Sequence, residues 1–211
     1  MKKVFFTALI FLTFYNLHAQ WGMAAIKLGY FNPSAADGGF IIGYEGGSYI
    51  DENFSFGWSI DWFHKNYVDK KLAGEFNNEF GGIGEENELR AKTNLHDFPL
   101  MINITGRIPV GPLVKVFLTG GVGAEVLLIN YRNFENPDQD KFQGAFDFDW
   151  RLGGGALYEI GRRSEVFGEL VYHSSQPSWE YEVETGGRKR TFERVYDMSG
   201  MMLRIGFRFY Y

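Results

Sequence analysis

Apolar and polar residues alternate with a period of two along most of the chain. Eight segments show this alternation, which is typical of β-strands with one apolar and one polar face. The segments are residues 24–31, 40–50, 54–68, 95–108, 113–131, 144–160, 165–175 and 195–211. No apolar run after the first 20 residues is long enough for a membrane-spanning helix. The pattern predicts an all-β domain of eight antiparallel strands.

The second face of these strands carries charges of both signs. Its charged members are Lys27, Glu45, Asp61, Arg107, Lys115, Glu125, Asp147, Asp149, Arg151, Glu159, Glu169, Arg204 and Arg208. A soluble, lipocalin-like barrel would turn these charges outward, whereas a transmembrane barrel places them in the lumen and turns the apolar face to lipid. Alternation alone is compatible with both arrangements.

The connections between the segments favour the transmembrane barrel. Short links at 51–53, 110–112 and 162–164 alternate with longer ones at 32–39, 69–92, 133–142 and 176–194. Outer-membrane barrels have short turns at the periplasmic rim and longer loops outside. The expected fold is therefore an eight-stranded antiparallel up-and-down transmembrane β-barrel, with both termini periplasmic.

The two ends of the chain agree with export to the outer membrane. Residues 1–19 have the features of a signal peptide: Lys2 and Lys3, an apolar run over 4–15, and Ala19 before the expected cut. An N-terminal anchor is the alternative reading of this segment. The barrel domain would then cover 20–211. Its last strand ends with Phe207, Phe209 and Tyr211, which resembles the C-terminal signal read by the barrel insertion machinery.

Composition narrows the possible partners and the means of stabilisation. Without Lys2 and Lys3 the chain keeps 26 acidic against 19 basic residues, so nucleic acid is not an expected partner. There is no cysteine, which excludes disulfides and thiolate metal sites. Sixteen of the 27 glycines lie within the alternating segments, where they favour bends and close packing.

The charges assigned to the lumen are nearly balanced, six basic against seven acidic. Unpaired buried charges are costly, so the balance indicates an ion-pair network rather than an open pore. An eight-stranded barrel is also narrow enough for side chains to fill it. We expect Glu169 to pair with Arg204 or Arg208.

The chain resembles a known family in the stretch from Asp97 to Gly123. Asp97-Phe98-Pro99-Leu100 opens a strand, a turn follows at 108–112, and Leu118-Thr119-Gly120-Gly121-Val122-Gly123 lies in the next strand. These residues are similar to the small OmpA/OmpX-type outer-membrane barrels, and more closely to the outer-membrane β-barrel domain group that includes PorT-like proteins. The resemblance implies the fold, and a structural, adhesive or secretion-related role.

His173 and Ser175 are the candidates for chemistry. A His-x-Ser pair on one strand places both side chains on the same face, here the lumen side, about 6–7 Å apart. The pair resembles the first two positions of the His-x-Ser-Asn motif of outer-membrane lipid A deacylases, but Gln176 replaces the asparagine. His64 and His96 are a possible pair near strand ends, with no third ligand. No cofactor or metal is expected.

The sequence therefore leaves several functions open. The leading interpretation is a non-enzymatic outer-membrane barrel that is structural or presents loops 69–92 and 176–194 to an extracellular or secretion-system protein. Outer-membrane lipid and the insertion machinery are its other expected partners. The alternatives are a lipid A-modifying hydrolase that uses His173 and Ser175, a lipocalin-like binder, and a diffusion pore.

Overall fold

The computed structural model describes residues 22–68, 92–132, 140–185 and 188–211, and in this part of the chain the regular structure is β-strand. The strands are β1 (Gly22–Pro33), β2 (Gly39–Tyr49), β3 (Phe54–Val68), β4 (Lys92–Pro109), β5 (Val114–Arg132), β6 (Asp140–Gly161), β7 (Ser164–Ser174), β8 (Ser178–Thr185), β9 (Arg188–Val195) and β10 (Gly200–Tyr210). No helix in the described ranges combines the length and hydropathy needed to cross a bilayer. The expected signal peptide lies outside these residues.

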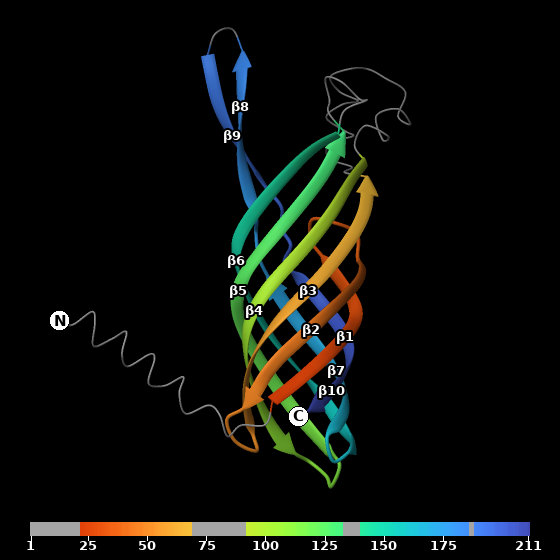
Figure 1. The fold of residues 1–211 in the computed structure, drawn as a ribbon. Helices are drawn as coiled ribbons and strands as arrows, with labels where there is room; N and C mark the ends of the chain where they lie inside the picture. Colours follow the sequence, from red (N-terminus) through yellow and green to blue (C-terminus); the bar gives the residue numbers. More distant parts are fainter. Residues whose placement is uncertain (1–21, 69–91, 133–139, 186–187) are drawn as a thin grey trace, which may run out of the picture.

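Eight of the strands close into a barrel. Each strand from β1 to β6 pairs antiparallel with the next, β7 pairs with β10, and β10 returns to β1 (Figure 1). The closing pair runs from Met23 opposite Tyr210 to Pro33 opposite Gly200. Closure leaves no unpaired edge in the barrel wall. The predicted fold class is confirmed.

The two faces of the wall are inverted relative to a soluble barrel. Large apolar side chains on the face predicted to be apolar are exposed on the outside, among them Ile26, Leu28, Phe56, Trp58, Ile102, Leu152, Leu203 and Ile205. Charged side chains on the second face are buried inside, including Asp61 and Arg204. This arrangement is that of a barrel whose solvent is lipid.

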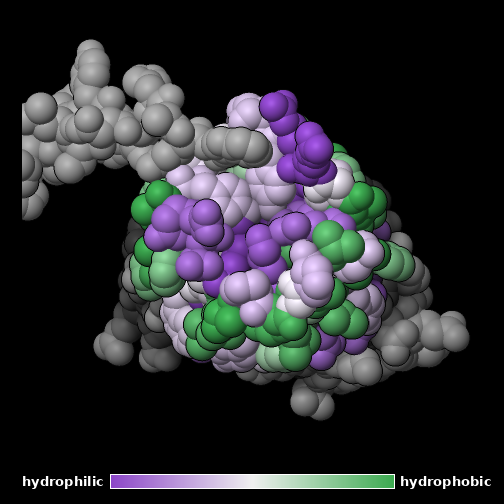
Figure 2. All heavy atoms as spheres, turned by 90° about the horizontal axis from the view of Figure 1, so that it is seen from below, coloured by the Kyte–Doolittle hydropathy of each residue, from purple (hydrophilic) through white to green (hydrophobic). Residues whose placement is uncertain are grey.

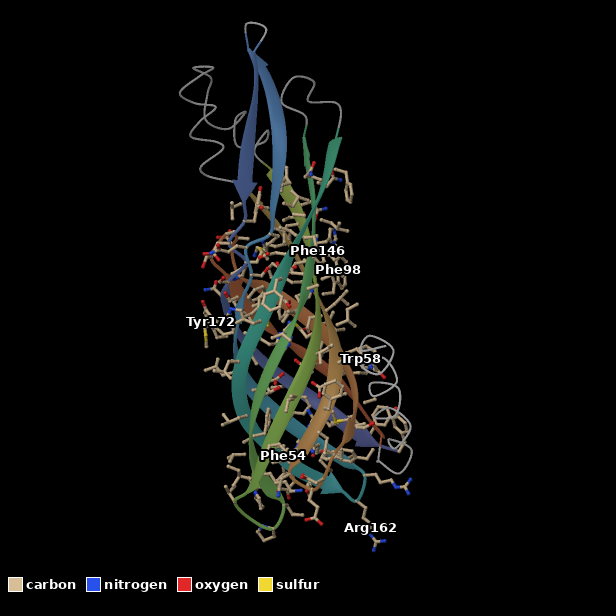
Figure 3. The ribbon with its side chains drawn as sticks, turned by 90° about the vertical axis from the view of Figure 1, so that its left-hand side faces the viewer. Phe54, Trp58, Phe98, Phe146, Arg162 and Tyr172 are labelled. Atoms are coloured by element: carbon tan, nitrogen blue, oxygen red, sulfur yellow. The ribbon has the colours of Figure 1, made fainter. Side chains whose placement is uncertain are left out.

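Aromatic side chains lie toward both ends of the wall. Phe98, Phe146 and Tyr172 are found toward the end that carries β8 and β9, whereas Phe54 lies near the opposite rim (Figure 3). Arg162 marks that opposite rim, where the turn between β6 and β7 is two residues long. Aromatic girdles of this kind are typical of the two interfaces of a membrane barrel.

Short turns close one rim of the barrel. In the turn from β2 to β3, the backbone N–H groups of Asn53 and Phe54 both donate to Asp51 Oδ1 at 2.7 Å. An Asx turn of this kind satisfies the backbone locally and fixes the strand register. Both ends of the described chain lie at the same rim, where Gly22 and Tyr211 exchange backbone hydrogen bonds at 3.1 and 3.0 Å.

The segment predicted as a long loop over 176–194 contains a hairpin. Strands β8 and β9 pair from Ser178 opposite Val195 to Thr185 opposite Arg188, and they project beyond the barrel rim (Figure 1). The last barrel strand consequently begins at Gly200 rather than at Val195. The stacked rings of Trp179 and Tyr196, with centroids 5.2 Å apart, lie at the base of the hairpin.

The interior is arranged in layers that the sequence does not reveal. The strand ends nearest the hairpin contribute a buried apolar cluster, called here the apolar plug, which consists of Phe31, Ile41, Phe63, Leu95, Leu127, Ile129, Ala145, Val171, Tyr196, Met198 and Met202. A smaller cluster of Ala25, Phe117, Leu157 and Phe167 lies toward the short turns. The sequence predicts an ion-pair network in the lumen but does not predict these two apolar clusters, which share the interior with the charges.

The plug gives a direct test of the interior packing. Phe63 is fully buried there, in edge-to-face contact with Phe31 at a centroid distance of 5.1 Å. We expect Phe63→Ala to lower the free energy of unfolding by about 3–5 kcal/mol, because it leaves a cavity. The measurement is urea unfolding in detergent micelles. The matched control is Phe40→Ala, since Phe40 is 84% exposed on the outer face; equal losses in the two variants would contradict the packing.

Candidate functional site

The central layer of charges is organised around Asp61. Its Oδ2 accepts hydrogen bonds from Arg151 Nη1 at 2.5 Å and from Arg204 Nη1 at 3.0 Å. The three side chains come from β3, β6 and β10, and all are almost completely buried. Gly43 lies directly opposite Asp61 on β2, where a Cβ atom would overlap the carboxylate. A glycine therefore provides the room for the charge.

A second part of the layer continues from Arg204. Its Nε lies 2.9 Å from Glu169 Oε1, and the two residues are directly opposite on β10 and β7. Lys27 Nζ approaches the same Glu169 oxygen at 3.9 Å and donates to Glu45 Oε2 at 2.8 Å. These contacts place Glu169 beside Arg204, which is one of the two arginines named for it from the sequence.

Arg208 extends the pairs toward the short-turn rim. It contacts Glu45 Oε1 at 3.2 Å and also pairs with Glu165. The sequence prediction of the lumen omits Glu165, although it lies four residues before Glu169 and therefore on the same face of β7. Arg107 lies near this end, with its guanidinium 4.1 Å from the ring centre of Tyr49. Seen from that end, hydrophilic side chains cover the middle of the barrel (Figure 2).

Three of the predicted lumen charges lie away from the central layer. Lys115 and Glu159 pair at 2.7 Å near the short turns, where each side chain is 32% exposed. Asp147 lies toward the other end and accepts the backbone N–H of Gln176 at 2.6 Å and the hydroxyl of Ser175 at 3.4 Å. These residues hold the ends of strands rather than the core of the network.

A separate group of acidic side chains surrounds His173. Its Nε2 lies 2.7 Å from Glu125 Oε2, and both side chains are fully buried. Asp149 is close to both, since one donor atom from each of the three residues lies within 4.8 Å of the others. Asp97 is also fully buried and interacts with Glu125. The sequence predicts Glu125, Asp149 and His173 on the lumen side, but it gives no sign that they meet, and the prediction omits Asp97.

The proposed hydrolytic pair is not arranged for catalysis on lipid. His173 is fully buried inside the barrel, where its ring contacts Phe31 edge to face at 5.8 Å. Its Nε2 is engaged by Glu125, and its Nδ1 has no hydrogen-bond partner. Ser175 is 3% exposed and donates to Asp147 instead. A serine activated by histidine needs a hydrogen bond between the two side chains.

The other histidine pair lies toward the outer face. His64 and His96 are directly opposite on β3 and β4, with ring centroids 4.4 Å apart. Trp62 Nε1 donates to His96 Nδ1 at 3.2 Å, so one imidazole nitrogen is already used. Among the described residues, neither histidine belongs to a group of three possible metal ligands. The arrangement is an aromatic stack at the end of two strands.

No family model and no curated protein sequence matches the chain. Solved structures do match, over nearly the whole chain. A major outer membrane protein from Thermus thermophilus has a TM-score of 0.62 at 13% identity, covering 92% of this chain and 100% of that one. Neisserial surface protein A has a TM-score of 0.54 at 12% identity, covering 90% and 96%. OprG from Pseudomonas aeruginosa has a TM-score of 0.51 at 14% identity, covering 91% and 93%.

The chain has the fold of the small outer-membrane barrels. This confirms the fold implied by the resemblance to OmpA/OmpX-type proteins, and at these identities the likeness concerns the fold. As in any outer-membrane barrel of eight strands, the interior is just wide enough to be filled by side chains. In this barrel the filling is the apolar plug, the Asp61 layer and the acidic group around His173.

The Asp61 layer predicts a large cost for removing its central charge. Asp61→Asn leaves Arg151 and Arg204 buried without their shared carboxylate, and breaking a buried pair in this way costs about 3–5 kcal/mol. Urea unfolding in micelles measures the loss. Glu159→Gln is the control, because it breaks a partly exposed pair that is worth about 0–1 kcal/mol. Losses of similar size in both variants would show that the Asp61 pairs do not hold the barrel together.

Proposed function

We propose that the protein is a non-enzymatic integral outer-membrane barrel that presents its long-loop rim, and above all the β8–β9 hairpin, to a partner outside the cell. The observation that carries this proposal is the contrast between a filled interior and a hairpin that continues beyond the wall. A filled barrel offers little internal surface for function, so the rim is the accessible part.

The outer surface supports placement in a membrane. Exposed large apolar side chains surround the wall, and soluble proteins rarely expose contiguous apolar patches of this extent. Every barrel strand has a paired neighbour on both sides, which lipid requires of a spanning sheet. With short turns at the periplasmic rim, both termini would lie on the periplasmic side and the hairpin outside.

The filled interior also weighs against the alternative functions. The lumen of a lipocalin-like binder would be open to a ligand, whereas here the apolar plug and the ion pairs occupy it. An apolar hollow does occur on the outer wall, where Ile104, Leu118 and Leu152 line it. Lipid chains would lie against this part of the wall. A lipid hydrolase is disfavoured because His173 is enclosed by the barrel.

Surface labelling tests the location and the orientation. An epitope inserted between Gly186 and Gly187, in the link from β8 to β9, should bind antibody on intact cells. The same epitope inserted between Arg162 and Arg163, in the short turn of the opposite rim, should bind antibody only after the outer membrane is permeabilised. Both fusions should keep the heat-modifiable migration of a folded barrel. Labelling of the short turn on intact cells would reverse the proposed orientation.

Conductance tests the filled lumen. We expect the purified protein in planar lipid bilayers to show no steady channel, because the plug and the Asp61 layer cross the interior. A general porin reconstituted in the same way provides the positive control. Reproducible open steps from the folded protein would show that the lumen conducts and would favour the diffusion pore.

A further inference from the structure

The acidic group around His173 lies on three neighbouring strands. Glu125 is on β5, Asp149 on β6 and His173 on β7, and β5 pairs with β6 while β6 pairs with β7. One donor atom from each residue lies within 4.8 Å of the other two. All three side chains are fully buried. Strand pairing thus fixes one imidazole and two carboxylates around a single point inside the barrel.

Most of the polar atoms in this group lack a hydrogen-bond partner. Both carboxylate oxygens of Asp149, Oε1 of Glu125 and Nδ1 of His173 are buried and unpartnered. Neighbouring Asp97 is also fully buried, and its carboxyl group interacts with that of Glu125, so it adds a further acidic group to the site. Burying a polar group without a partner is costly, and burying a charge without one is far more so. The group therefore requires a positively charged ligand or added protons.

The balance of buried charge points to two missing positive charges. Within the described residues, the buried set contains seven carboxylates, namely Glu45, Asp61, Asp97, Glu125, Asp149, Glu165 and Glu169. The same set contains five Lys and Arg side chains, namely Lys27, Arg107, Arg151, Arg204 and Arg208. Arg151 lies near the acidic group, but its hydrogen bond goes to Asp61. A divalent cation would balance the excess.

The donor set selects the class of cation. One imidazole nitrogen with carboxylate oxygens suits Zn²⁺ and similar first-row ions, whereas Ca²⁺ and Mg²⁺ prefer oxygen ligands alone. Two donors bound to tetrahedral Zn²⁺ at about 2.0–2.2 Å lie about 3.3–3.6 Å apart. The donor atoms here lie within 4.8 Å of one another, so the side chains would close around the ion on binding. Gly123 leaves room for the site, since a Cβ atom there would lie 2.7 Å from Asp149 Oδ1.

We propose that Glu125, Asp149 and His173 bind a divalent first-row metal ion, with Zn²⁺ as the best match. Asp97 adds negative charge beside Glu125 without being one of the three ligands. The site is structural, because Phe31 of the apolar plug contacts His173 and encloses it. The ion would join the neighbouring strands β5, β6 and β7 on the inner face of the wall. This proposal is independent of the barrel's partner outside the cell.

Refolding with and without metal tests the proposal on the wild-type protein. The full chain is unfolded in urea with EDTA, freed of chelator, and refolded in detergent micelles with or without Zn²⁺. After desalting, elemental analysis should find about one Zn²⁺ per chain, and the temperature of the heat-modifiable mobility shift should be higher with the ion. Binding of less than about one-tenth of an equivalent would overturn the proposal.

Matched variants identify the ligands. Asp149→Asn and His173→Gln keep the approximate size of each side chain and should lose the bound Zn²⁺. Asp147→Asn is the control, because Asp147 lies two residues away on β6 and binds Gln176 rather than the site; it should retain the ion. Co²⁺ should give visible absorption bands in the wild type and the control alone. If Asp149→Asn or His173→Gln still holds a full equivalent, the assignment is wrong.

The wild-type comparison remains decisive if a variant does not fold. A folded wild type whose thermal transition is the same with EDTA as with Zn²⁺, and shifts only on acidification, would mean that protons neutralise the carboxylates. That result would overturn the metal site, and it would leave the presentation of the hairpin unaffected.

Discussion

A sheet surrounded by lipid has no water to bind its unpaired backbone groups, so the first strand must pair with the last. Here β1 and β10 meet along eleven consecutive residue pairs, from Met23–Tyr210 to Pro33–Gly200. The closure fixes the diameter, because eight strands leave an interior only as wide as packed side chains. The dense filling of the lumen by side chains follows from this constraint.

In a narrow interior, a large side chain needs a small residue beside it on the neighbouring strand. Gly43 lies opposite Asp61, and Gly206 lies opposite Phe167, so that each large side chain enters the space above a neighbouring glycine. Gly123 and Asp149 are related in the same way. Glycine at these three positions is thus a packing requirement of the barrel, since a side chain there would push the neighbouring large residue out of place.

The outer face and the strand order could be predicted because they depend on local alternation, as at Phe56 and Trp58. Contacts between side chains of non-adjacent strands could not, since His173 on β7 meets Glu125 on β5, 48 residues earlier, over the intervening strand β6. At the strand ends nearest the hairpin, both faces carry apolar residues. The sequence therefore does not show that Phe31 points into the barrel while its neighbours along β1 face lipid. The β8–β9 hairpin is not predicted either. Its sequence is rich in charged residues, which is typical of a loop, and it lacks the apolar face of the barrel strands.

The layered filling also explains why charges lie in the middle of the lumen. Buried ion pairs often stabilise a protein less than apolar side chains of the same volume, so stability alone does not require them. A unique strand register, however, requires that the two faces of a strand differ in polarity. A slip of one residue would turn every lumen-facing side chain of that strand toward lipid. Such a slip would move Asp61 or Arg151 into lipid, at a cost of several kcal/mol. The charged layer therefore fixes the register that the apolar plug, with similar residues on both faces, leaves undetermined.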